Sequence, residues 1–192
     1  MLGDNIRAKL FSEDFRRDLQ GYQAVEVFRG HAERAPEHPL SRVQYLDLKT
    51  YLVGDILTMV DRASMAHGLE VRVPILDHKL VEWMAGLSPD LKLRGREGKY
   101  LFKKSLESRL PREILYRPKM GFAVPLASWF RGPLRERVRS SLLGPVMQES
   151  GIFDSGFLRQ MVDMHQSGRR DFSSPIWSLL MFEAFQRKQK NY

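Results

Sequence analysis

The stretch from Asp55 to Asp77 places the strongest constraint on the fold, because a helical apolar pattern gives way there to an extended segment. Apolar side chains recur at helical spacing between residues 56 and 66, and Gly68 is a natural end for this helix. The residues that follow are rich in valine and stop at Pro74, which disfavours helix in the residue before it. The stretch therefore predicts a helix that leads into an extended connection.

This stretch contains more charged residues than a buried helix tolerates, so their presence needs a physical explanation. Asp55 and Arg62 are seven residues apart on one side of the predicted helix, and Glu70 and Arg72 alternate with valines so that both face the same way. Spacing alone leaves two interpretations open: a salt-bridge cluster that fixes the helix to the loop, and a ligand site.

A second candidate stretch contains Lys99, which follows Gly95-Arg-Glu-Gly98 and precedes a helix predicted from Tyr100 to Leu110. A lysine near a helix N-terminus can meet an anion, since unpaired amides and the helix dipole add to its charge. The spacing is too short for a P-loop, and Tyr100 stands where a P-loop has Ser or Thr. The alternative is a lysine that only solvates a helix start.

A basic loop follows, in which Pro118 excludes a continuous helix. Arg117 and Lys119 beside the flexible Gly121 are typical of a lid over an anionic ligand. A basic surface loop without a ligand is the alternative interpretation.

Positive charge is concentrated in one part of the chain. The net charge is +8, but the window from Lys92 to Arg139 alone contains fourteen Lys or Arg and four Asp or Glu, a local +10. Such a surface attracts nucleotide phosphates, pyrophosphate or nucleic acid. It is equally compatible with a solvated basic surface.

The composition excludes several kinds of chemistry. There is no cysteine, so disulfides, thiolate metal sites and a cysteine nucleophile are excluded, and the five histidines show no metal-ligand spacing. We therefore expect no metal site built by protein ligands alone. No apolar run approaches the roughly 18 residues of a membrane helix, and the N-terminus lacks a signal-peptide core. We expect no membrane contact and a cytoplasmic location.

Two stretches resemble the signatures of the synthetase domain of the glutamine-hydrolysing asparagine synthetase family. They are DRASMAHGLEVRVPILDHKLVE, which begins at Asp61, and GREGKYLFKKSLESRLPREILYRPKMGFAVPLASWF, which begins at Gly95. The resemblance implies a carbon–nitrogen ligase that activates a carboxylate, of aspartate or an analogue, with ATP and releases pyrophosphate. Ammonia from glutamine then displaces AMP to form an amide.

The resemblance also implies roles for individual residues. Lys99 matches the family lysine that stabilises charge on the activated carboxylate, and Asp55 falls at or next to an acid on the active-site side of its helix. The residues expected to support the substrate or nucleotide site, through matches to the signatures or as part of the basic loop, are Asp61, Arg62, Glu70, Arg72, Asp77, Arg117 and Lys119.

Two parts of the family's site are missing from these 192 residues: the Ser-Gly-Gly loop that holds ATP with Mg²⁺, and the acidic loop after it. We therefore interpret residues 1–192 as a single partial domain, the C-terminal portion of an asparagine synthetase-type synthetase domain, which is inactive alone. ATP and Mg²⁺ are expected only with the upstream synthetase half. That half, a glutaminase domain and a small carboxylate substrate are the expected partners, and nucleic acid is not expected.

The predicted fold is mainly α, the helical half of an α/β adenine-nucleotide-hydrolase-like (ATP pyrophosphatase) domain, with a short extended piece near 70–73. Ser12 and Asp154 or Ser155 are predicted helix caps, and Trp83 is predicted in the core. The final helix is predicted from residue 174 to 189 and is expected to dock into the core through the apolar residues Ile176, Leu179, Leu180, Phe182 and Phe185. A face left bare by the missing sheet suggests self-association. The competing hypothesis is a non-catalytic basic helical module that binds nucleic acid or a partner protein.

Overall fold

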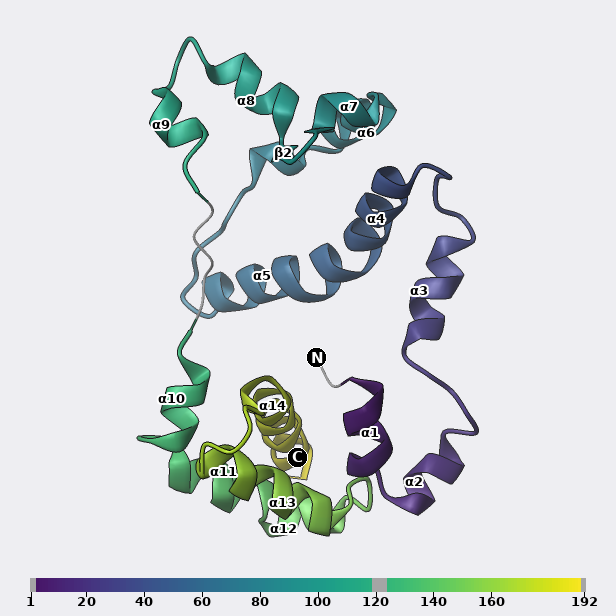
Figure 1. Ribbon diagram of the computed structural model, residues 1–192, viewed down its shortest axis with the longest axis vertical. Helices are drawn as coiled ribbons and strands as arrows, with labels where there is room; N and C mark the ends of the chain where they lie inside the picture. The colour runs from purple at the N-terminus through teal and green to yellow at the C-terminus, as the bar shows by residue number, and fades with distance from the viewer. Residues whose placement is uncertain (1–2, 119–123, 191–192) are drawn as a thin grey trace. The chain divides into compact units, whose positions relative to one another are not determined.

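The computed structural model describes residues 3–118 and 124–190 and is mainly helical (Figure 1). This confirms the expected mainly α fold class. Beside its helices, the described part of the chain has one two-stranded antiparallel sheet and one isolated β-bridge. None of its helices is both long enough and apolar enough to cross a membrane. The chain divides into two compact units: unit 1, residues 1–22 and 121–192, and unit 2, residues 23–120.

Unit 1 combines short helices from the N-terminal end of the chain with the C-terminal helices. Its elements are α1 (Asp4–Leu10), α2 (Glu13–Asp18), α10 (Leu126–Arg131), α11 (Arg135–Leu142), α12 (Pro145–Glu149), α13 (Ser155–Gln166) and α14 (Ser173–Lys190). The predicted caps are confirmed: Ser12 Oγ accepts a hydrogen bond from the Phe15 N–H at 3.1 Å, and Asp154 Oδ1 accepts one from the Phe157 N–H at 2.6 Å. Such caps satisfy amides that have no partner within the helix.

Unit 1 has one continuous apolar core. Phe130, Met161 and Ile176 are completely buried in it, and burying a side chain of this size contributes about 1.5–3 kcal/mol. The buried apolar residues of the core are Leu10, Phe130, Val138, Leu142, Met147, Leu158, Met161, Val162, Phe172, Ile176 and Leu179. The helices of unit 1 are therefore stabilised mainly by packing against one another.

Helix α14 docks into this core as predicted, with one exception. The predicted residues found in the core or packed against it are Ile176, Leu179, Leu180 and Phe182. The prediction was wrong for Phe185, whose side chain is 58% exposed. Phe185 lies four residues after the exposed Met181, on the side of the helix away from Ile176, so the apolar residues of α14 occupy two faces and the core covers one.

An N-terminal and a C-terminal segment of the chain pair with each other within unit 1. An isolated antiparallel bridge pairs Phe11 with Phe153, and the Ser12 N–H donates to the carbonyl of Ile152 at 2.9 Å. The rings of Phe11 and Phe153 lie with their centroids 6.2 Å apart. Residues separated by about 140 positions thus form one unit, with unit 2 inserted between them in sequence.

Unit 2 is a series of helices with one small hairpin. Its elements are α3 (Val25–Ala32), α4 (Pro39–Asp47), η1 (Leu48–Leu57), α5 (Thr58–Met65), η2 (Pro74–Leu76), α6 (His78–Gly86), α7 (Pro89–Lys92), β1 (Leu93–Arg94), β2 (Glu97–Gly98), α8 (Tyr100–Leu106) and α9 (Arg112–Leu115). Helix α8 ends earlier than predicted, because residues 107–110 form turns before Pro111.

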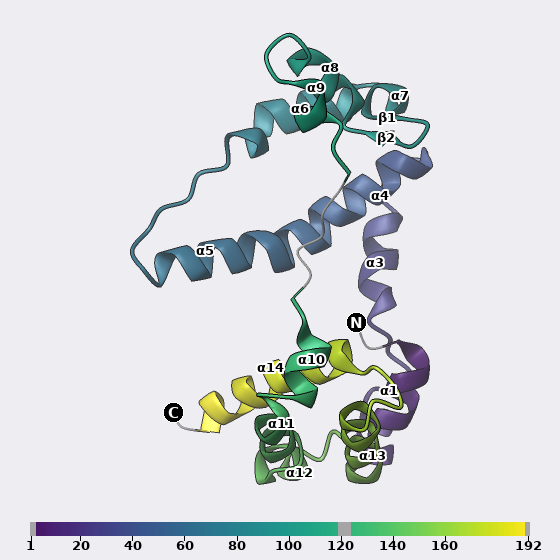
Figure 2. The ribbon, with the colours of Figure 1, turned by 60° about the vertical axis from the view of Figure 1, so that its left-hand side comes forward.

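Helices α4, η1 and α5 follow one another as a single long helix (Figure 2). The middle segment η1 is a π-helix of ten residues, and Gly54 lies inside it without interrupting the helix. Within η1 the Thr50 hydroxyl donates to the carbonyl of Leu46 at 2.7 Å, and the Thr58 hydroxyl after it donates to that of Val53 at 2.8 Å. A π-helix widens the turn, so the helical face expected from 3.6-residue spacing does not hold across this segment.

A short extended piece was predicted near residues 70–73, and the paired strands of unit 2 lie elsewhere. Residues 70–73 form no strand, since the structure pairs them with no second strand. The strands instead form a hairpin in which Leu93 faces Gly98 and Arg94 faces Glu97. Its two-residue loop begins with Gly95 at φ +60°, the left-handed conformation that a tight hairpin turn requires of its first residue.

No apolar side chain is buried among the described residues of unit 2. The prediction that Trp83 lies in the core was wrong, because its side chain is 56% exposed. Helical spacing identifies the apolar face of α6 correctly, but within this chain no second layer covers that face. Unit 2 therefore depends on local contacts, which are individually weak.

His165 is a completely buried titratable residue in unit 1. Its Nδ1 accepts a hydrogen bond from the Phe172 N–H at 3.0 Å, and its carbonyl oxygen accepts one from Arg131 Nε at 2.9 Å. Within the described ranges, no acceptor meets hydrogen-bond geometry at Nε2. Burial, together with the positive charge of Arg131, lowers the pKa of the imidazole, and the opposing effects of Asp171 and the Ala127 carbonyl are smaller.

We predict that unit 1 loses stability as the pH falls through about 6.5, the ordinary pKa of histidine. The folded state keeps His165 neutral, so below this pH the unfolded state binds more protons and unfolding is favoured. One proton gives a slope of at most about 1.4 kcal/mol per pH unit. Urea unfolding followed by Trp129 and Trp177 fluorescence between pH 5 and 8 measures this slope.

His165→Gln removes the titrating group, so its unfolding free energy should vary less with pH than that of the wild type. His38→Gln, at an exposed histidine of unit 2, serves as the control and should keep the wild-type slope. Equal slopes in all three proteins contradict the prediction.

Candidate active site

Lys99 lies between the β1–β2 hairpin and α8, and its backbone conformation is unusual. Its φ of 58° and ψ of 34° place a non-glycine residue in the left-handed region, which costs about 1–2 kcal/mol. Strained backbone of this kind occurs where surrounding structure imposes it, often at functional sites. The side chain is exposed, and among the described residues it has no hydrogen-bond or ion-pair partner.

Two cations near Lys99, Lys103 and Arg94, are already engaged. Lys103 forms an ion pair with Glu97. Arg94 donates to the Tyr100 hydroxyl at 2.5 Å and lies over the same ring, 5.0 Å from its centroid. Lys99 and Arg96, which lies in the hairpin loop, are both exposed and have no side-chain partner among the described residues, so both stay available to an anion.

A second cluster links α8 to the segment after α9. Glu107 accepts a hydrogen bond from the Tyr116 hydroxyl at 2.6 Å and one from Lys104 at 2.9 Å. These two bonds lower the pKa of the Glu107 carboxyl, and in turn Glu107 raises the pKa values of Lys104 and Tyr116. Sequence reasoning missed Tyr116 and Glu107, although an aromatic residue between basic ones was the available signal.

Arg117 directly follows Tyr116. Its side chain is exposed and has no partner within the described ranges. Lys119, the other predicted residue of this loop, lies outside the described residues.

Glu70 and Arg72 form an ion pair, with Arg72 Nε donating to Glu70 Oε1 at 2.7 Å. Their side chains are 69% and 82% exposed, so the pair contributes at most about 1 kcal/mol and orients rather than stabilises the segment. It agrees with the prediction that both residues face the same way.

Asp77 caps a helix. Its Oδ1 accepts from the N–H groups of Lys79 and Leu80, at 3.0 and 3.4 Å, at the start of α6. Both bonds satisfy amides of the first turn, which have no intrahelical acceptor. In this structure, Asp77 therefore supports α6.

The remaining predicted residues lie on the long helix. Asp55 is exposed in η1, and Asp61 and Arg62 are exposed in α5. No side-chain hydrogen bond or ion pair in the described part of the chain connects these three residues to Lys99. The structure thus brings Glu70 together with Arg72 and keeps the other predicted site residues apart.

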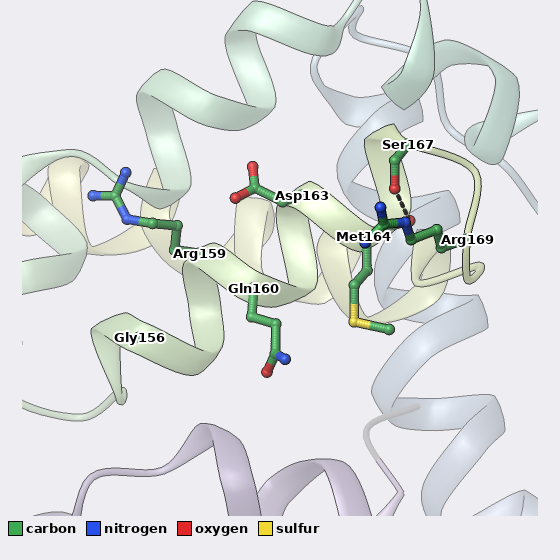
Figure 3. A pocket seen from close by; sticks show the side chains of 7 residues that line it. All are labelled: Gly156, Arg159, Gln160, Asp163, Met164, Ser167 and Arg169. Atoms are coloured by element: carbon green, nitrogen blue, oxygen red, sulfur yellow. Dashed lines mark hydrogen bonds between the residues drawn. The ribbon is translucent and has the colours of Figure 1, made fainter.

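Two surface hollows lie in unit 1, and none of the predicted site residues lines either of them. One, of about 720 Å³, follows α13 and is drawn in Figure 3. It is lined by Gly156, Arg159, Gln160, Asp163, Met164, Ser167 and Arg169. The other, of about 410 Å³, lies beside it near α12. Asp163 already pairs with Arg139 at 2.5 Å, and Figure 3 shows the Arg159 side chain pointing away from Arg169, so the charged groups of this hollow do not converge.

Within 3–118 and 124–190, no group of three or more carboxylate or imidazole side chains is placed to hold a metal ion. The exposed cations Lys99 and Arg117 suit contacts to an oxyanion.

The comparisons with known proteins identify the family of this chain. The asparagine synthase family model matches residues 1–187. A Mycobacterium bovis protein whose name assigns it to the glutamine-hydrolysing asparagine synthetases is 36% identical over 185 residues, covering 86% of this chain and 28% of the relative. Glutamine-hydrolysing asparagine synthetase 1 of Bacillus subtilis is 30% identical over 184 residues, covering 91% of this chain and 28% of the relative.

This chain belongs to the asparagine synthase family. It spans about 28% of the length of these relatives. No solved structure matches it significantly.

We predict that Asp77 acts through helix α6 alone. Asp77→Ala should reduce the hydrogen-exchange protection of residues 78–86 about fivefold, since a lost N-cap costs about 1 kcal/mol. Asp77→Asn keeps a capping oxygen and should retain most of the protection. Exchange measured by mass spectrometry on the three proteins tests this.

Glu82→Ala, an exposed substitution within the same helix, is the control and should leave the protection unchanged. If Asp77→Ala matches this control, the cap makes no contribution to α6.

Proposed function

We propose that this chain is the C-terminal segment of an asparagine synthetase-like amidotransferase, a carbon–nitrogen ligase. The complete enzyme activates the carboxylate of aspartate or an analogue with ATP and forms an amide with ammonia from glutamine. This segment supplies cationic groups to that reaction and is inactive alone.

The observation that carries the proposal is the state of Lys99. It lies in a family signature, its backbone is held in the left-handed region, and its ammonium has no partner among described residues, although Lys103 and Arg94 nearby are paired. A fixed, unpaired cation is suited to stabilise negative charge that develops during a reaction, because it needs no reorganisation when the charge appears.

Lys99 accordingly stabilises the negative charge that builds on the oxygens of the activated carboxylate when ammonia attacks its carbon. Arg117 contacts the leaving oxyanion from the loop after α9. Asp77, through α6, and the Glu70–Arg72 pair hold the connecting segment that follows α5. Neither of these groups takes part in bond making.

Two further parts of the enzyme lie outside this chain. The chain has no cysteine, so a cysteine-dependent release of ammonia from glutamine belongs to a separate glutaminase domain. ATP and Mg²⁺ belong to the upstream synthetase half. The exposed apolar side chains of unit 2, such as Met59, Val71 and Trp83, support this arrangement, because contact with that half buries surface that this chain leaves in water.

The test is to join this chain, covalently or in trans, to the upstream half of the synthetase domain. Pyrophosphate release that requires ATP, the carboxylate substrate and both parts supports the proposal. No gain over the upstream half alone would falsify it.

In the joined enzyme, Lys99→Ala should lower turnover by about two to three orders of magnitude, the scale of losing one electrostatic stabiliser. Lys99→Arg should recover little, because a planar guanidinium does not replace a compact ammonium at close range. Steady-state pyrophosphate release measures both effects.

Lys79→Ala, at an exposed lysine of α6, is the matched control and should keep wild-type turnover. Melting curves should agree among the four proteins to within a few degrees. Near-normal turnover of Lys99→Ala means that Lys99 only solvates the helix start.

A further inference from the structure

Tyr116 is the centre of a set of contacts that joins two parts of unit 2. Its hydroxyl donates to Glu107 Oε1 at 2.6 Å, and the other oxygen of Glu107 accepts from Lys104 at 2.9 Å. The Lys103 ammonium and the Arg112 guanidinium lie over its ring, 5.0 and 4.8 Å from the centroid. A single side chain thus contacts groups on both α8 and α9.

The two ends of this network adjoin the two unpaired cations of the candidate site. At one end, Lys103 pairs with Glu97, which stands two residues before Lys99. At the other end, Tyr116 is the residue immediately before Arg117. The backbone positions of Lys99 and Arg117 are therefore connected through contacts of the Tyr116 side chain.

We propose that Tyr116 is a positioning residue, which holds the turn of Lys99 and the segment of Arg117 at a fixed separation so that both cations bind one phosphate-type oxyanion. This inference rests on the proposed function, in which Lys99 and Arg117 each contact an oxyanion, and it adds that the two cations share one of them, the phosphate-type group. Tyr116 itself does not touch the anion.

Because the contacts of Tyr116 are exposed, they contribute more to the position of the two segments than to the stability of the fold. Lys104 is 49% exposed and Glu107 is 32% exposed, and surface ion pairs of this kind contribute only about 0–1 kcal/mol to folding. They still restrict the side chains and the chain segments that carry them. Loss of the Tyr116 hydroxyl should therefore change the binding of an anion more than it changes the melting temperature.

Calorimetric titration of this chain with inorganic pyrophosphate tests the proposal. Tyr116→Phe keeps the ring and its cation contacts and removes only the hydroxyl bond to Glu107. Its pyrophosphate affinity should fall about fivefold, the equivalent of about 1 kcal/mol for one hydrogen bond. Lys99→Ala should weaken pyrophosphate binding at least as much.

The matched control is Tyr45→Phe. The Tyr45 ring also lies near a cation, the Lys49 ammonium at 5.7 Å, but its hydroxyl has no partner in the described part of unit 2. This variant should bind pyrophosphate like the wild type.

Tyrosine ionisation provides a second readout, which a merely structural role would not predict. The hydrogen bond to Glu107 raises the pKa of Tyr116, so the absorbance difference at high pH between wild type and Tyr116→Phe should reveal a late-titrating phenol. Glu107→Gln should bring this titration back toward the ordinary tyrosine value and weaken pyrophosphate binding.

The outcomes distinguish the inference from the function on which it rests. Equal affinities in Tyr116→Phe and Tyr45→Phe overturn the role of Tyr116 and leave the proposed function standing. Wild-type affinity in Lys99→Ala, or no pyrophosphate binding by the wild type, overturns the two-cation site. The proposed function is decided separately, by pyrophosphate release from the joined halves.

Discussion

The burial of apolar side chains in unit 1 is the constraint on which the rest of the structure depends. Every buried apolar residue among the described positions belongs to this unit, where helices from both chain ends surround Phe130, Met161 and Ile176. Burial is the main favourable term in folding, and it must offset a conformational entropy loss of about 1–2 kcal/mol for each ordered residue. Unit 1 meets this requirement with its own residues, and unit 2 does not.

The candidate site lies in unit 2, which lacks an apolar core. This explains why local interactions hold its residues in place. In unit 2 the predicted residues are held by local devices: Asp77 caps α6, Glu70 pairs with Arg72, and Gly95 forms the hairpin that precedes Lys99. Such devices set the conformation of each segment but cannot bring distant segments together. A compact site formed by Asp55 and Lys99 therefore requires contacts that the described residues of unit 2 do not provide.

The accuracy of the sequence-based predictions depends on whether a feature is local or needs a partner from elsewhere in the structure. Ser12 and Asp154 were predicted as caps and are confirmed, because a cap depends on residues within one helical turn. Trp83 and Phe185 were predicted as buried and are exposed, because helical spacing identifies an apolar face without revealing what covers it. Residues 70–73 were predicted as a short extended piece, and they form no strand because extended residues do so only with a partner.

The sequence by itself determined the helical elements, their caps and the signature motifs that identify the family, since all of these are local patterns. Tertiary structure alone decided that Phe11 pairs with Phe153, that His165 is enclosed, and that Tyr116 links α8 to α9. The physical reason is that burial and long-range hydrogen bonds depend on residues far apart in the chain. Their proximity results from packing, which spacing along the sequence does not encode.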